Sequence, residues 1–191
     1  YADETSSTYN MKAQRAFENV FGPIDYSWNS GDVHIVCMRN MHWFNQTDAA
    51  HYAMCYTDEQ VKWLRQDLAT VPKDKLLIYC VHIPVCSATS NNNVQNVISL
   101  INQFKETHVM SGHTHYNRND TALSGTSTYE HIHGAVCGVW WYSNVNGDGT
   151  PNGYGVYDIN GSTITNWYYQ GVNEGMNDRN YQLRLYRGNL K

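Results

Sequence analysis

Three histidines in this chain stand where imidazole nitrogens could bind a metal ion. His82 follows the apolar run LLIYCV, and His113 and His115 follow the run HVM, with Ser111 and Gly112 in between. Neutral imidazole is the commonest protein ligand for zinc, iron and manganese. A His-x-His pair can supply two ligands from one turn, and a preceding glycine gives the backbone freedom to turn. We therefore predict a metal role for the three histidines, in preference to three unrelated polar residues at strand ends.

The segments that carry these histidines are predicted to form a β-α-β unit. The run at 76–81 is continuously apolar, as expected for a strand buried on both faces, and Pro84 ends it. Apolar residues then recur at helical spacing over 94–104, before a short strand at 108–110. The strands of such a unit are parallel neighbours, so their carboxyl ends meet at the edge where open α/β sheets bind ligands.

Local patterns predict the other elements. Apolar spacing favours a helix over 9–20, and a turn at 29–32 joins two expected strands. The segment 39–56 is interpreted as an irregular aromatic surface loop. Thr57 and Gln60 form a capping box that starts a helix to about Ala69.

Strand-like runs follow one another after Tyr116, without long helical patterns. They include YQLRLY near the C-terminus, and the pair around Asn160-Gly161 carries a strong hairpin signal. The second half is therefore predicted to be antiparallel sheet that continues from the β-α-β core.

Composition limits the class of protein. The 191 residues are 41% hydrophobic and 16% charged, with a net charge of -4, which indicates a globular chain with one core. No basic stripe favours nucleic acid, and no apolar run is long enough to span a membrane. Abundant Tyr and Trp beside sparse Lys favour an extracytoplasmic location, periplasmic or at the cell surface. The five cysteines form no C-x-x-C pair, and most are expected to be buried free thiols, with a Cys80–Cys86 link left open.

The order of these motifs resembles the second half of the calcineurin-like metallophosphoesterases. That family carries, in chain order, Asp-x-His, Gly-Asp, Gly-Asn-His-Asp/Glu, a His after a strand and then Gly-His-x-His. Here VHIP resembles the fourth block and GHTH the fifth, and FGPIDYSWNSGDVHIVCMRN resembles the family's hairpin. The segment from GAVCGVWW to NWYYQ is similar to a bacterial subgroup of predicted phosphohydrolases in this family.

The first three blocks of the family do not occur. Gly31-Asp32 could be taken for the second block, but it belongs to a predicted hairpin turn rather than to a strand end. We therefore interpret residues 1–191 as a single partial catalytic domain that lacks its N-terminal half. The expected fold class is α/β, namely the C-terminal part of the metallophosphoesterase α/β/β/α sandwich. It comprises a β-α-β unit followed by antiparallel strands.

The resemblance implies hydrolysis of a small phosphomonoester or phosphodiester by two metal ions, drawn from Fe, Mn or Zn. His82 and His113 would bind one ion and His115 the other. The remaining ligands and the histidine that protonates the leaving group are expected upstream of Tyr1, so no catalytic acid is assigned in this chain. We expect the chain alone to hold its metals partially or not at all and to be a poor catalyst.

The sequence also contains candidate substrate-binding residues and a second His-x-His pair, and it leaves two alternative functions open. Tyr116, Trp140 and Trp141 are candidates for a substrate wall. His131 and His133 form a second His-x-His, expected to be a solvated or core-lining pair on one face of a strand. The alternatives are an aromatic-rich β module that binds carbohydrate or surfaces, and a mononuclear three-His zinc protein.

Overall fold

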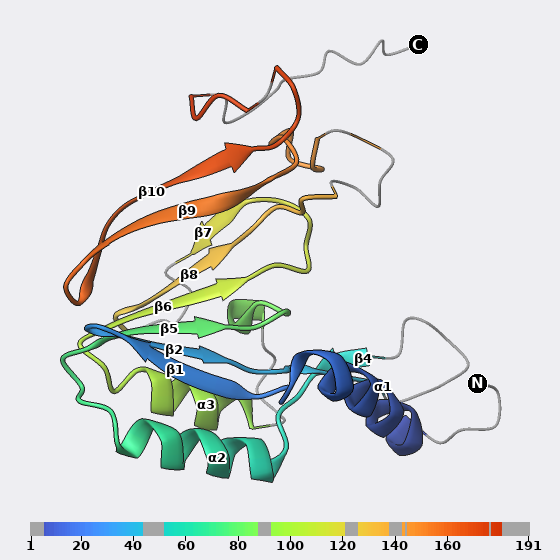
Figure 1. Ribbon diagram of the computed structural model, residues 1–191, viewed down its shortest axis with the longest axis vertical. Coiled ribbons are helices and arrows are strands. Elements are labelled where there is room, and N and C mark those ends of the chain that lie inside the picture. Colours follow the sequence, from blue (N-terminus) through green and yellow to red (C-terminus); the bar gives the residue numbers. More distant parts are fainter. Residues whose placement is uncertain are drawn as a thin grey trace.

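A six-stranded sheet organises the chain in a computed structural model that describes residues 6–43, 52–87, 93–120, 126–137, 143, 145–175 and 177–180. The strand order is β1-β2-β5-β6-β8-β7 (Figure 1). The strands are β1 (Tyr26–Ser30), β2 (Val33–Cys37), β5 (Leu76–Cys80), β6 (Glu106–Ser111), β7 (Arg118–Asp120) and β8 (Thr128–Ile132). Strands β2, β5, β6 and β8 are parallel, and β1 and β7 run antiparallel at the two edges. Four strands therefore end at the same edge.

Two helices cover one face of this sheet, α2 (Asp58–Ala69) and α3 (Val94–Ile101) (Figure 1). Both ends of the Thr57–Gln60 capping box are formed, so the predicted start of α2 is confirmed. Sheet residues Val36 and Val109 are fully buried in one core cluster with the helices. Because β5 and β6 are paired in parallel across α3, the predicted β-α-β unit is confirmed.

A hairpin of β9 (Gly153–Asn160) and β10 (Thr163–Gly171) packs on the opposite face of the sheet (Figure 1). Gly161 lies in the left-handed region with φ 59°, as the hairpin signal requires. The ring of Trp167 packs edge-on against His131, with centroids 5.1 Å apart. Helices, sheet and hairpin form three layers of a mixed α/β fold, which confirms the predicted class.

The second half is not purely antiparallel, and here the sequence prediction is wrong. β8 pairs with β6 in parallel, with Thr107 opposite Thr128 and Ser111 opposite Ile132. Alternation along β8 places Ile132 on the helix-covered face and His131 on the hairpin face, and both residues are buried. A strand that must bury both faces is stable inside the sheet, so β8 extends the parallel core.

The expectation that β5 is buried on both faces is also wrong in part. Leu77 and Tyr79, on the helix face, are fully buried, whereas Ile78 and Cys80 are only half-buried. The segment 39–56 was expected to be irregular, but it contains β3 (Met41–Trp43) and β4 (Tyr52–Met54), which pair antiparallel. Residues 44–51 and the predicted strand at 181–186 lie outside the described residues.

The predicted N-terminal helix is present as α1 (Ser6–Phe21), but its apolar residues are not buried. Phe17 is 42% exposed and Val20 is 71% exposed. A 3-10 turn, η1 (Val85–Ser87), follows β5. No helix in the described part of the chain has the length and apolar character needed to cross a membrane.

The five cysteines are free thiols, as predicted, but each is half-buried rather than buried. No bond joins Cys80 to Cys86. The sulfur of Cys86 instead accepts a hydrogen bond of 3.0 Å from the guanidinium of Arg118.

Candidate metal centre

His82 and His113 meet at the carboxyl edge of the sheet. His82 follows β5 and His113 follows β6, and the Nε2 atom of His82 lies 3.1 Å from the Nδ1 atom of His113. The main chain is tied at the same place, because the N–H of Gly112 donates to the carbonyl of His82 at 3.1 Å. Parallel pairing of β5 with β6 therefore brings together two side chains that are 31 residues apart in sequence.

Both imidazoles are in the protonation state that binds metals. Burial lowers the pKa of His82, and the neighbouring His113 and His115 lower it further. Burial also lowers the pKa of His113, with a further contribution from His115. Each ring is therefore neutral at neutral pH and has one nitrogen lone pair available for a ligand bond.

The separation of the two nitrogens fits two ligands of one ion. Nitrogen ligands about 2.1 Å from zinc lie about 3.0–3.4 Å from each other, depending on the angle at the metal. The far nitrogen of His113, Nε2, contacts the hydroxyl of Tyr52 at 3.2 Å. Such a partner fixes the orientation of a ligating ring. Among the described residues, however, no three His, Cys, Asp or Glu side chains come together as a complete set of ligands.

The turn after β6 holds His113 and His115 in an unusual backbone conformation. His113 has φ 68° and His115 has φ 57°, and a hydrogen bond of 2.7 Å from Thr114 N–H to the Gly112 carbonyl closes a three-residue turn around His113. L-residues with side chains adopt this left-handed region at a cost of about 1–2 kcal/mol. Strain of this kind is concentrated at functional sites.

The role predicted for Gly112 is wrong. Its φ is not in the left-handed region, and a Cβ atom there would meet nothing within 4 Å. The backbone turns at His113 and His115 themselves. The sequence identified the correct turn, but it could not indicate which residues carry the left-handed conformation.

Asn40 supports the proposed site, and no sequence motif indicated it. Its fully buried carboxamide lies beyond the end of β2, and its oxygen accepts hydrogen bonds from the main-chain N–H groups of His82 at 3.2 Å and Ile83 at 3.0 Å. Its nitrogen donates to the carbonyl of Ile83 at 2.7 Å. Asn40 thereby fixes the backbone that presents His82. Its position 42 residues before His82 leaves no local signal in the sequence.

Glu130 performs a similar task behind the same edge. Its carboxylate is fully buried and accepts hydrogen bonds from the N–H of Val85 at 2.9 Å and the N–H of Cys86 at 2.8 Å. It also accepts one from the hydroxyl of Ser111 at 2.8 Å. One buried carboxylate therefore ties the turn after His82 to the strand end before His113, and its three donors compensate for burial of the charge.

The second His-x-His lines the interface between sheet and hairpin. His131 is 1% exposed, and its two ring nitrogens contact His108 Nδ1 at 2.9 Å and Asn119 Oδ1 at 3.0 Å. His133 contacts the hydroxyl of Tyr157 at 2.6 Å. The rings of His131 and His133 stack 6.4 Å apart, which agrees with the predicted placement on one face. Of the two predicted roles, solvated or core-lining, the contacts of this pair fit the core-lining one.

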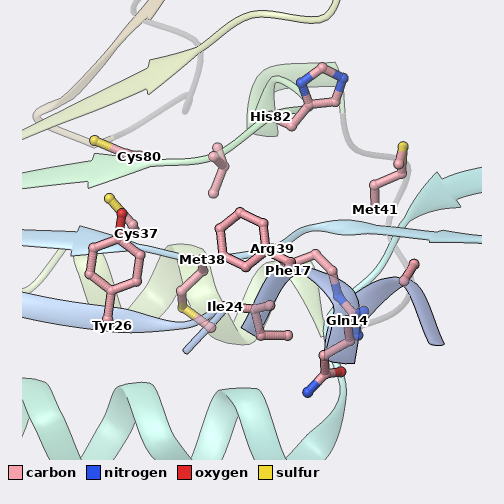
Figure 2. Close-up of a pocket in the computed structure, with 12 residues that line it drawn as sticks. Gln14, Phe17, Ile24, Tyr26, Cys37, Met38, Arg39, Met41, Cys80 and His82 are labelled. Carbon is pink, nitrogen blue, oxygen red and sulfur yellow. The ribbon is translucent and has the colours of Figure 1, made fainter. Parts of the chain in front are cut away.

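A pocket of about 530 Å³ adjoins His82 and is lined by side chains from α1, β1, β2 and β3 (Figure 2). Arg39 lines it, and within the described residues the buried Nε of this side chain has no hydrogen-bond partner. Tyr116, a candidate for the substrate wall, is half-buried in the turn after His115 and does not line this pocket. Trp140 and Trp141 lie outside the described residues.

The C-terminal part of the chain matches a known protein family. Residues 130–191 match the family described as the C terminal of calcineurin-like phosphoesterase. A search of curated proteins finds no match to the chain. The matched segment begins in β8 and includes the hairpin of β9 and β10.

The match relates residues 130–191 to the C-terminal part of the calcineurin-like phosphoesterases. This match confirms the predicted resemblance to a C-terminal part of that family, through the region that includes the segment from GAVCGVWW to NWYYQ. The family indicates a hydrolase of phosphoesters in general. Because His82, His113 and His115 precede the matched segment, their role rests on the geometry at the sheet edge.

Proposed function

We propose that His82 and His113 are two ligands of one metal ion in a phosphoester-hydrolysing centre, and that His115 serves a second ion. The observation that carries this proposal is the 3.1 Å contact between His82 Nε2 and His113 Nδ1 at the shared carboxyl edge of β5 and β6. The family match independently supports phosphoester hydrolysis as the reaction class.

Each residue has a defined part in the proposed centre. His82 and His113 hold one ion, Asn40 fixes the main chain of His82, and the Tyr52 hydroxyl orients the ring of His113. When bound, the ions supply Lewis-acid stabilisation of the charge that develops on the phosphoryl group. Zinc, iron and manganese all accept imidazole, so all three belong to the proposal. The described residues provide no converging carboxylate, and we therefore expect weak metal binding by this chain.

The proposed substrate is a small phosphate ester. Arg39 lines the same pocket as His82, and its cationic side chain can attract a phosphoryl oxygen there. Monoesters and diesters are both within the proposal, and comparison of p-nitrophenyl phosphate with its bis ester as substrates distinguishes them.

Neither alternative gains support from the geometry. The three imidazoles are not grouped with one another as a metal site, which a mononuclear three-His zinc protein would require. Trp167, an aromatic residue of β10 that is 39% exposed, packs against Tyr129 and His131 between the hairpin and the sheet. The contact between His82 and His113 supports one shared ion, and the second ion at His115 is proposed from the family resemblance.

Calorimetric titration of the chain with Zn²⁺ and Mn²⁺ tests the proposal. His82→Ala and His113→Ala should each weaken binding by at least about tenfold, because each removes a ligand. His42→Ala is the control, since His42 is half-buried like His113 but lies on β3 near Arg39 and Gln60. Binding that His82→Ala and His113→Ala leave unchanged would contradict the assignment.

A further inference from the structure

We propose that Cys37 and Cys80 are a redox-active thiol pair, which a peroxide converts to a disulfide between two neighbouring strands. Cys37 is the last residue of β2 and Cys80 is the last residue of β5. They are direct partners in the parallel pairing of these strands. This site lies outside the matched family segment and makes no use of the proposed metal centre.

The backbone places the two sulfur atoms together. Partners on adjacent strands have Cα atoms about 4.8 Å apart, within the span of about 4.4–6.8 Å that a disulfide bridges. Alternation puts both side chains on the face opposite the helices, because Val36 and Tyr79, one residue earlier on each strand, are buried in the helix-side core. Figure 2 shows both sulfurs on the same side of the pocket.

Neighbouring polar groups favour the thiolate of one cysteine. The adjacent Cys80 thiol and the Tyr26 hydroxyl together lower the pKa of Cys37 to about 7 despite its partial burial. A substantial fraction of Cys37 is therefore thiolate, the reactive form, at neutral pH. Burial instead raises the pKa of Cys55, which lies away from this pair. Cys37 is thus the first nucleophile.

The pair is accessible to a small oxidant. Both cysteines line the pocket of about 530 Å³ that also contains Tyr26 and His82 (Figure 2). Each is half-buried, so a molecule as small as hydrogen peroxide can reach the sulfur of Cys37. Partial exposure beside a polar partner is typical of redox-sensitive cysteines.

The reaction has two balanced steps. The Cys37 thiolate attacks one oxygen of hydrogen peroxide, the O–O bond breaks, and after proton uptake the products are a sulfenic acid and water. The sulfur of Cys80 then attacks the sulfenic sulfur, an S–S bond forms, and the S–O bond breaks. The departing hydroxide takes the Cys80 proton and leaves as a second water. Two thiols are oxidised while one peroxide is reduced.

The bond would join β2 to β5 at their carboxyl ends. Asn40 lies three residues beyond Cys37 and His82 lies two residues beyond Cys80. Oxidation would therefore link the two strand ends from which the Asn40–His82 hydrogen bond extends. The proposed disulfide would therefore lie next to the sheet edge that carries His82.

Peptide mapping after peroxide treatment tests the proposal. Trypsin leaves Cys37 in peptide 16–39 but places Cys80 and Cys86 together in peptide 76–105, so Cys86→Ser is the appropriate background. After oxidation and alkylation, we expect a linked 16–39/76–105 species that has lost two hydrogens and that a reductant separates. Cys55→Ser should form the same species, while Tyr26→Phe should form it several-fold more slowly, because the hydroxyl that helps to lower the pKa of Cys37 is lost.

Three outcomes would overturn the proposal. Alkylation of Cys37 and Cys80 as separate thiols after peroxide treatment would show that no bond forms. Sulfinic acid on Cys37 without a linked peptide would show that Cys80 does not resolve the first product. Linkage of either residue to Cys55 or Cys137 instead would show that the strand register does not determine the pairing.

Discussion

The carboxamide oxygen of Asn40 accepts a hydrogen bond of 3.2 Å from the main-chain N–H of His82. A side chain at the end of one strand thereby determines the position of a proposed metal ligand on the next. Asn40 is fully buried and also satisfies the N–H and carbonyl of Ile83. Its removal leaves three main-chain groups without their partner, two of them in the buried residue Ile83.

Asn40→Ala should therefore lower the free energy of unfolding by about 2–4 kcal/mol, since each unsatisfied buried group costs about 1–3 kcal/mol and water replaces part of the loss. Urea denaturation monitored by tryptophan fluorescence measures the change. The control is Asn166→Ala, because Asn166 also makes a side-chain hydrogen bond, to Asp158, but is exposed. We expect a change within about 0.5 kcal/mol for the control. Equal losses for both variants would contradict the role assigned to Asn40.

The left-handed conformation of His113 makes a second prediction. His113→Gly should be more stable than His113→Ala by about 1 kcal/mol, because glycine adopts φ 68° without the steric penalty that a Cβ atom causes. At Thr114, which is not among the residues with positive φ, the order should reverse and glycine should be the less stable variant. Urea denaturation of the four variants measures both differences. Alanine and glycine variants of His113 with the same stability would argue against the strained turn.

The buried histidines of the sheet–hairpin interface predict acid sensitivity. Burial and the neighbouring His108 and His133 lower the pKa of His131 to about 3. Burial also lowers the pKa of His108, although Glu106 opposes this effect. In the unfolded chain a histidine takes up a proton near pH 6.5, whereas folded His131 does not. The contribution of neutral His131 to the free energy of unfolding is therefore fully present above pH 6.5. It is lost as the pH falls from 6.5 towards 3.

The free energy of unfolding should fall by up to about 1.4 kcal/mol per pH unit for each such histidine in this range. Urea denaturation at pH 7.5, 6.5 and 5.5 measures the slope. His131→Gln removes one titrating group and should give a shallower slope than the unmodified chain. The hypothesis fails if the two slopes are identical.

Local patterns predicted the elements whose formation depends on neighbouring residues. The capping box at Thr57, the hairpin turn at Gly161 and the β-α-β unit around α3 follow from short-range hydrogen bonds and apolar spacing. The β-α-β prediction also placed His82 and His113 at one sheet edge, because parallel strands joined by a helix end on the same side. The candidate site could therefore be predicted before any distance was known.

Only the tertiary structure decided the contacts between segments that are far apart in the chain. Three contacts depend on which strand lies beside which. They are the parallel pairing of β8 with β6, the hydrogen bond from the His82 N–H to Asn40, and the pairing of Cys37 with Cys80. The sequence by itself determined which segments become strands, since alternation and turns are local. It did not determine their partners, because strand register depends on which side chains of the whole chain are buried together.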